Sequence, residues 1–317
     1  MPTVQAIHSR TAPVFKSTRL KRITVLAGGP GPEREVSLNS GIAVQDALLR
    51  LGYDVSMRDI HPGELSALEV PSDFIFIVLH GEFGEDGALQ HELEGRGLAY
   101  CGSDSKSSRL AMNKVHAKRC FERAGIPTPG YEVVTARSTK SVFDHFPTPA
   151  VVKPVSSGSS VDTFIVRTSA DVAKYAQFVA EKYGEALLER YVQGPELTVG
   201  VVGETALPVC EIRTRREFYD YQAKYIDDDT QYLFDLDLPA ALLTRVQQLS
   251  VRAHQSLGCR VFSRVDWKID AETYEPFILE VNTIPGFTDH SLLPKSAARA
   301  GIPFDQLIQT ILDLSIT

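Results

Sequence analysis

The sequence predicts a protein of mixed α/β and α+β class that is divided into three folding units. Near its start, short apolar strands alternate with glycine-rich loops and helices, which is typical of an open parallel sheet. Toward its end, residues 264–270 and 277–282 alternate polar with apolar side chains around a polar turn, which indicates an antiparallel hairpin. With 317 residues, the chain is long enough for two or three domains with separate cores.

Composition narrows the classes of partner. The net charge of −7 and the pI of about 5.7 argue against nucleic acid, because a phosphate backbone requires a basic surface. No apolar run reaches the ~18 residues of a membrane span, so we expect a soluble, cytoplasmic protein that binds no membrane. The cysteines are scattered without a C-x-x-C pair, which favours free buried thiols: Cys101, Cys120, Cys210 and Cys259.

Residues 1–22 differ from the rest of the chain. They contain five basic residues, several hydroxyl side chains and no acidic residue. This composition is compatible with an organellar transit peptide, but a disordered start or a misassigned start codon is the preferred interpretation. We favour a disordered basic extension.

The first unit is expected over residues 23–105, as an N-terminal open parallel α/β domain. Its glycine loop precedes a helix, which favours an anion or small ligand, but the loop lacks G-x-G-x-x-G, so NAD is not favoured. His80 follows an apolar strand, at the sheet edge where such folds bind ligands, although a structural role is equally open. The expected elements are a strand over 23–28, a helix with apolar positions Ile42, Val44, Leu48 and Leu51, strands over 53–60 and 74–79, a helix over 87–97 and a strand over 98–101.

The second unit is expected over residues 106–192, as a central α+β lid domain. Lys153 lies on a strand that is followed by the hydroxyl-rich turn S-S-G-S-S-V. Such a turn can cover a phosphate with backbone N–H groups and hydroxyls, but a plain hairpin turn fits as well, and no P-loop pattern is present. The expected elements are a helix over 107–125, strands over 131–135, 150–155 and 163–167, a helix over 169–184 and a strand over 186–192.

The third unit is expected over residues 193–317, as a C-terminal α+β domain that contains the hairpin. Before the hairpin, residues 213–229 combine tyrosines, a lysine and acidic residues in a pattern too irregular for a strand, which indicates an active-site lid. The expected elements are strands over 196–202 and 206–212, a helix over 239–258, the hairpin, a loop at Ser291 and Leu292 and a helix over 304–314.

The hairpin carries a set of oxygen ligands. Arg264 and Asp266 share one face of its first strand, and Glu280 and Asn282 share one face of its second. Pairing the strands brings two carboxylates and an amide together. Hard oxygen ligands favour Mg²⁺ held against phosphates, whereas zinc prefers nitrogen and sulfur.

Seven segments taken in order carry a resemblance. They are G-G-P-G-P-E-R-E-V-S-L-N-S-G, L-H-G-E-F-G-E-D-G, G-S-D-S-K-S-S-R-L-A-M-N-K, V-V-K-P-V-S-S-G-S-S-V, F-Y-D-Y-Q-A-K-Y, R-V-D and L-E-V-N-T-I-P-G-F-T-D-H-S-L-L-P. In this order and approximate spacing they resemble the D-alanine–D-alanine ligase family, which has the ATP-grasp fold. The resemblance covers residues 23–317.

The resemblance implies roles for individual residues. ATP as substrate is implied to contact Lys114, Lys153, Glu189, Arg190, Glu196 and Lys224. Two Mg²⁺ (or Mn²⁺) ions are implied at Asp266, Glu280 and Asn282. For D-alanine the implied contacts are Glu33, Val36 and His80 for the first molecule, Arg264 and the Gly286 backbone for the oxyanion, Ser291 and Leu292 for the second molecule, and Ser159 and Tyr225 as hydrogen-bond partners of Glu33.

The implied activity is ATP-dependent ligation of two D-alanine molecules through an acyl phosphate, by a homodimer. The sequence departs from the family at Asp162, where glycine is usual, and at Gln222, where glutamate is usual, and Arg190 replaces a lysine. We expect Asp162 to point to solvent. The alternatives are a ligase that joins D-alanine to D-lactate, another ATP-grasp ligase, and a binding protein without turnover; Tyr225 favours a second D-alanine.

Overall fold

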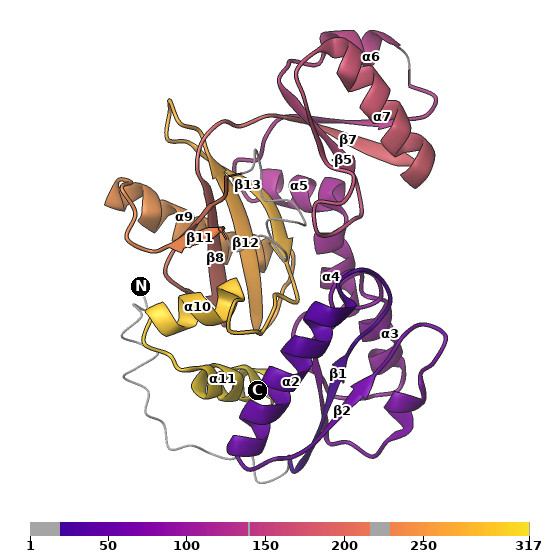
Figure 1. Ribbon diagram of the computed structural model, residues 1–317, viewed down its shortest axis with the longest axis vertical. Helices are drawn as coiled ribbons and strands as arrows, with labels where there is room; N and C mark the ends of the chain where they lie inside the picture. The colour runs from indigo at the N-terminus through magenta and orange to yellow at the C-terminus, as the bar shows by residue number, and fades with distance from the viewer. Residues whose placement is uncertain (1–19, 139, 216–228, 317) are drawn as a thin grey trace.

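The computed structural model describes residues 20–138, 140–215 and 229–316. Figure 1 shows three groups of elements, each built on a sheet: the first part of the chain at the bottom, the last part in the middle, and the central part at the top. Among the described residues, no helix has the length and apolar character needed to cross a membrane. All four cysteines are free and buried, as predicted.

The first sheet has three parallel strands in the order β2-β1-β3, which confirms the predicted parallel sheet. The segment 98–101 is not the predicted strand, because it contributes only an isolated parallel bridge between Ile75 and Tyr100. The elements are β1 (Arg22–Ala27), α2 (Arg34–Arg50), β2 (Asp54–Asp59), the 3-10 helix η1 (Ser66–Glu69), β3 (Phe74–Ile77) and α3 (Ala88–Gly95).

Helix α2 packs on this sheet through small side chains. Val44 and Leu48 are buried as predicted, but Ile42 is 50% exposed, so the predicted apolar face is only partly correct. Gly41 lies in the buried face instead, and a Cβ atom there would be 2.7 Å from the Ala27 Cβ atom. Glycine therefore permits a close approach of helix to strand that the apolar period alone does not reveal.

A hydroxyl fixes the start of α2 against the sheet. The Ser37 hydroxyl accepts from the Gly28 N–H (2.9 Å) and donates to the Val78 carbonyl (2.8 Å). It thereby ties the first turn of the helix to the ends of β1 and β3. Glu33, which immediately precedes the helix, is held at the same sheet edge as His80.

Residues 105–123 form two helices, α4 (Ser105–Met112) and α5 (Lys114–Arg123), so the single predicted helix is wrong. Asn113 interrupts it with extended backbone (φ −83°, ψ 101°), and its side-chain oxygen accepts from the His116 N–H at 2.9 Å. An asparagine in this position satisfies one of the unpaired N–H groups of a new helix, which favours the break.

The second sheet is antiparallel, with strand order β4-β7-β5-β6. Helices α6 and α7 cover it at the top of Figure 1. The hydroxyl-rich turn joins β5 to β6, an antiparallel pair, as predicted. The elements are β4 (Tyr131–Thr135), α6 (Lys140–His145), β5 (Ala150–Pro154), β6 (Phe164–Val166), α7 (Ser169–Tyr183) and β7 (Glu185–Arg190).

The third sheet runs β11-β10-β8-β12-β13, with β9 paired to β8. The hairpin is confirmed, but the strand predicted over 206–212 is divided between two strands, and a helix begins at Leu292 where a loop was predicted. The elements are β8 (Glu196–Val202), β9 (Thr205–Ala206), β10 (Cys210–Arg213), β11 (Gln231–Leu233), α9 (Ala240–Ser256), β12 (Phe262–Ile269), β13 (Pro276–Asn282), α10 (Leu292–Arg299) and α11 (Phe304–Ile316).

The end of the chain packs back on the first sheet. One apolar cluster contains side chains of β1 and β3 together with side chains of α10 and α11. In it, the Phe287 ring lies edge-on against Phe76 (centroids 5.7 Å apart) and against Phe262 (5.5 Å). The first and third sheets therefore share a core, which fixes the loop after β13 against the loop after β3.

Candidate active site

The hairpin separates two cavities. The first lies between the second and third sheets, and the second lies between the first and third. Glu280 borders both. Among the described residues, those predicted to contact ATP line the first cavity, together with Asp266: Lys114, Lys153, Glu189, Arg190 and Glu196. Among the described residues, those predicted to contact D-alanine line the second cavity, together with Asn282: Glu33, Val36, His80, Ser159, Arg264, Gly286, Ser291 and Leu292.

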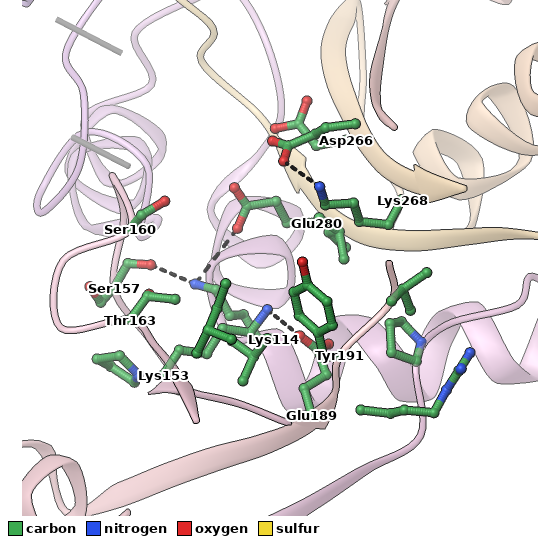
Figure 2. A pocket seen from close by; sticks show the side chains of 18 residues that line it. Lys114, Lys153, Ser157, Ser160, Thr163, Glu189, Tyr191, Asp266, Lys268 and Glu280 are labelled. Atoms are coloured by element: carbon green, nitrogen blue, oxygen red, sulfur yellow. Dashed lines mark hydrogen bonds and ion pairs between the residues drawn. The ribbon is translucent and has the colours of Figure 1, made fainter. Parts of the chain in front are cut away.

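Two lysines enter the first cavity from different elements. Lys114 begins α5, and its ammonium donates to the Ser157 carbonyl at 2.5 Å and lies 3.8 Å from the Glu280 carboxylate. Lys153, on β5, pairs with Glu189 on β7 at 2.5 Å. Figure 2 marks these contacts with dashed lines, from Lys114 to Ser157 and Glu280 and from Lys153 to Glu189. The break at Asn113 matters here, because it makes Lys114 the first residue of a helix beside the turn.

The buried carboxylate in this cavity is ionised. Burial by itself raises the pKa of Glu189, but the charges of Lys118 and Lys153 outweigh it and hold that pKa at about 2. Arg190 lies with its guanidinium 4.7 Å from the Phe277 ring centroid. Glu196 pairs with Lys268 at 3.3 Å. The cavity therefore combines several cationic side chains, which suit a polar anionic ligand, with the ionised Glu189 carboxylate.

The strand register of the hairpin brings the predicted ligand set together. Asp266 pairs with Glu280 across the two strands, and Asn282 lies opposite Arg264. The Asn282 amide donates to an Asp266 oxygen at 3.0 Å. The face predicted from the period of two is therefore confirmed.

The Asp266 carboxylate accepts hydrogen bonds from several neighbouring side chains. Arg264 donates to both of its oxygens (3.0 and 2.8 Å), and the buried Thr198 hydroxyl donates to one of them at 2.6 Å. Two carboxylates and an amide fit a hard cation that takes further oxygens from phosphate and water. The described residues contain no group of three or more His, Cys, Asp or Glu side chains placed for a metal ion.

Glu33 connects the second cavity to the hydroxyl-rich turn. The Ser159 hydroxyl donates to Glu33 at 2.5 Å across 126 residues of sequence. Ser159 has a φ of 52°, a left-handed conformation that non-glycine residues adopt only with strain. Gly81 lies on the other side, where a Cβ atom would be 2.8 Å from the Glu33 carboxylate. The carboxylate is thus held between a turn and a glycine backbone.

His80 is neutral and has a fixed tautomer. Burial lowers its pKa, and its Nδ1 lies 3.0 Å from the Ile284 carbonyl. Because a carbonyl only accepts, Nδ1 carries the proton, and Nε2 presents a lone pair. Nε2 has no hydrogen-bond partner among the described residues.

Glu85 is a site residue that the sequence reasoning missed. It lines the second cavity, and the Gly81 N–H donates to it at 2.7 Å. Burial, with a further contribution from the Glu33 charge, raises its pKa to about 8, so it carries a proton at neutral pH. The repeated acid in L-H-G-E-F-G-E-D-G was the available signal.

The segment after β13 forms the far wall of the second cavity. Ser291 occupies the N-cap position of α10, and its hydroxyl accepts from the Thr288 N–H at 3.0 Å and lies 2.8 Å from the Thr288 hydroxyl. A Cβ atom on Gly286 would lie 2.5 Å from the Ser291 hydroxyl, so glycine is required for this approach. The first N–H groups of a helix favour a negatively charged ligand group.

Asp162 does not point to solvent as predicted. Its carboxylate accepts from Lys182 (2.7 Å) and from the Tyr183 hydroxyl (2.5 Å), at the end of α7. These contacts lower its pKa. Its φ of 51° explains why glycine suits this position, and aspartate is among the residues that tolerate it. Lys224, Tyr225 and Gln222 lie outside the described residues.

An antiparallel lid sheet that faces a second sheet across a lysine-lined cavity, with paired carboxylates on the floor, defines the ATP-grasp class. A family model described as D-ala D-ala ligase C-terminus matches residues 120–313. The chain is 42% identical to a D-alanine–D-alanine ligase from Marinobacter nauticus, over 92% of this chain and 90% of that one.

Solved structures agree with this match. A D-alanine–D-alanine ligase from Bacillus anthracis superimposes with a TM-score of 0.84 at 35% identity, over 93% of this chain and 97% of that one. A D-alanine–D-alanine ligase from Bacillus anthracis in complex with ATP superimposes with a TM-score of 0.79 at 32% identity, over 93% of this chain and 97% of that one. The chain belongs to the D-alanine–D-alanine ligase family. The predicted family and ATP-grasp fold are confirmed.

Proposed function

We propose that the protein joins two D-alanine molecules into D-alanyl-D-alanine, with conversion of ATP to ADP and phosphate, for peptidoglycan precursor synthesis. The observation that carries this proposal is the Glu33–Ser159 contact, which links the turn over the first cavity to the amino-acid cavity. Curated relatives with this name cover most of the chain, which supports the same activity.

The chemistry accounts for two cavities that meet at one hairpin. A carboxylate does not react with an amine in water, because its leaving group would be oxide. One oxygen of the first D-alanine carboxylate attacks the γ-phosphorus of ATP, and ADP leaves. The neutral amine of the second D-alanine then attacks the acyl carbon, and phosphate leaves with that oxygen.

The residues of the second cavity suit the amino acids. We assign Glu33 and the His80 Nε2 lone pair to the ammonium group of the first D-alanine, with Val36 beside them. Arg264 and the Gly286 N–H stabilise the oxyanion on the acyl carbon. Ser291 and Leu292, at the start of α10, hold the carboxylate of the second D-alanine.

The first cavity suits ATP, which the ATP complex of the Bacillus anthracis relative supports. Lys114, Lys153 and Lys224 would meet the phosphates, and Glu189, Arg190 and Glu196 the rest of the nucleotide. Asp266, Glu280 and Asn282 would hold two Mg²⁺ (or Mn²⁺) ions. When bound, the ions neutralise charge that develops on the phosphoryl oxygens.

We also propose the domain division and the homodimer that the sequence indicates. The chain then has three domains, over residues 23–105, 106–192 and 193–317, after a basic N-terminal extension. The shared apolar cluster that joins the first sheet to α10 and α11 means that the first and third domains pack firmly together. A cytoplasmic homodimer remains part of the proposal, tested by sedimentation of the purified protein.

The test is an assay of purified protein with ATP, Mg²⁺ and a panel of D-amino and D-hydroxy acids. Phosphate release that requires both Mg²⁺ and D-alanine, with equimolar dipeptide, is expected. D-Alanyl-D-lactate as the main product would instead favour a depsipeptide ligase. Absence of D-alanine-dependent phosphate release would leave a binding protein without turnover.

Replacement of Tyr225 by phenylalanine is expected to shift acceptor choice toward D-lactate at lower pH. The lost hydroxyl belongs to the proposed hydrogen-bonded set with Glu33 and Ser159, which favours an amine acceptor. The ratio of dipeptide to depsipeptide, with both acceptors present, is measured across pH. Tyr221→Phe, four residues earlier in the sequence, serves as the control. A ratio that matches the wild type would remove this role from Tyr225.

Asp162→Gly is expected to loosen the turn that covers the first cavity. Glycine accepts the positive φ, but the contacts with Lys182 and Tyr183 are lost. Surface contacts of this kind contribute ~0.5–1 kcal/mol, so phosphate released without dipeptide should rise about two- to fivefold. The ratio of phosphate to dipeptide measures this, with Glu181→Gln as a control on the same helix. An unchanged ratio means that the contacts do not restrain the turn.

A further inference from the structure

Lys118 is a fully buried lysine that lies behind the wall of the first cavity. Its side chain is 0% exposed, and it is not among the residues that line the cavity, whereas its partner Glu189 is. Buried lysines are rare unless they are paired. Lys118 follows Lys114 by one helical turn on α5, which places it on the same face of the helix.

The Lys118 ammonium has three acceptors. It forms an ion pair with Glu189 and donates to the Thr128 hydroxyl (2.6 Å) and the Pro129 carbonyl (3.4 Å). It also lies 5.1 Å from the Tyr131 ring centroid. Burial lowers the pKa of Lys118, and the Glu189 charge opposes that effect. Such a complete set of acceptors favours the charged ammonium.

These partners belong to different parts of the fold. Glu189 lies on β7 of the lid sheet, and Thr128 lies in the linker before β4. The Thr128 hydroxyl donates to the Ile278 carbonyl at 3.0 Å, and the Ile278 N–H donates to the Pro127 carbonyl at 2.9 Å. Ile278 is two residues before Glu280 on β13. Lys118 therefore joins α5, the lid sheet and the hairpin at one point.

Glu189 has two basic neighbours with distinct positions. Lys118 reaches one carboxylate oxygen from behind, and Lys153 reaches the other from within the cavity. Without Lys118, both oxygens would compete for Lys153 and draw its ammonium away from a ligand. The carboxylate would also lose the contact that fixes its orientation.

We propose that Lys118 is a positioning residue for nucleotide binding, which holds Glu189 and leaves Lys153 available to the phosphates. This inference rests on the proposed use of ATP. Lys118 acts through Glu189, so its effect should fall on the nucleotide rather than on D-alanine, and should depend on the Glu189 charge.

The test compares Lys118→Met with the wild type by direct binding of Mg·ATP to the full-length chain, by calorimetry. Loss of a hydrogen-bonded ionic contact predicts binding about tenfold weaker or more, and a similar rise in the KM for ATP. The KM for D-alanine should change less than about twofold, within the scatter of distant substitutions. Lys106→Met, an exposed lysine on α4, serves as the matched control and should bind as the wild type does.

A Glu189→Gln background separates positioning from general packing. There, adding Lys118→Met should weaken Mg·ATP binding by less than about threefold, because no carboxylate remains to be held. A further tenfold loss would overturn the inference, as would wild-type affinity in Lys118→Met alone. If Lys118→Met fails to fold, the double variant, which has no buried unpaired carboxylate, still decides. A wild type that binds no Mg·ATP would overturn both the inference and the proposed function.

Discussion

Glu280→Gln is expected to abolish turnover while the protein still folds. Glu280 lies opposite Asp266 in the hairpin and borders both cavities, and its side chain is 29% exposed, so the core does not depend on it. Removing its charge deprives the proposed metal site of one of two carboxylates. Loss of electrostatic stabilisation of this kind lowers kcat by about 10³-fold. Dipeptide formation at saturating ATP and D-alanine measures the loss, and a thermal unfolding midpoint checks the fold.

Glu275→Gln provides the matched control on the same hairpin. Glu275 lies just before β13 and pairs with Arg245 (2.7 Å) away from the cavities, so kcat should stay within about twofold. A Mg²⁺ titration of Glu280→Gln adds a second measurement. Loss of a metal ligand should raise the half-saturating Mg²⁺ concentration, whereas a general defect would leave that concentration unchanged. If Glu280→Gln keeps its activity, the metal is held elsewhere.

Arg264→Met is expected to lower kcat by about 10²–10³-fold, the usual effect of removing an oxyanion donor. Arg264 lines the amino-acid cavity, and its guanidinium holds both oxygens of Asp266. Methionine keeps the length of the side chain and removes the donors. The KM for ATP should change little, because Arg264 does not line the first cavity. Steady-state kinetics with each substrate varied in turn measure this split.

The contact between Arg264 and Asp266 offers a rival explanation, in which the variant fails through the metal site. A Mg²⁺ titration distinguishes the two. An unchanged half-saturating Mg²⁺ concentration places the defect at the acyl carbon. A large rise in that concentration, with kcat restored at high Mg²⁺, would contradict the oxyanion role. Arg264→Lys, which keeps the charge but not the fork, should recover only part of the rate.

The sequence predicts what depends on local periodicity. The parallel first sheet follows from short apolar strands that alternate with glycine-rich loops and helices. The hairpin register, and with it the meeting of Asp266, Glu280 and Asn282, follows from alternating polar and apolar side chains. The break at Asn113 escaped because the helical pattern continues through it, and only the capping hydrogen bond to His116 reveals the new helix. The sequence also did not predict the start of α10, since Pro285 and Gly286 indicate a loop in this segment.

Local residue patterns did not predict the contacts between segments that are distant in the sequence. The contact between Glu33 and Ser159 spans 126 residues, and the family resemblance rather than any local pattern indicated it. The raised pKa of Glu85 arises from burial in a cavity between two sheets, which composition does not reveal. Lys118 was not predicted because its acceptors lie in two separate segments, the linker at Thr128 and Pro129 and strand β7 at Glu189. Its spacing of four residues from Lys114 was the one available signal.

The most direct test of the account follows oxygen through the reaction. D-Alanine with both carboxylate oxygens replaced by ¹⁸O is incubated with ATP, Mg²⁺ and the purified protein, and the phosphate is examined by mass spectrometry. If the carboxylate is phosphorylated and then attacked by the second amine, each phosphate released with a dipeptide contains one ¹⁸O atom. Phosphate without ¹⁸O would mean that the carboxylate never joins the γ-phosphorus, and would contradict the proposed ligation through an acyl phosphate.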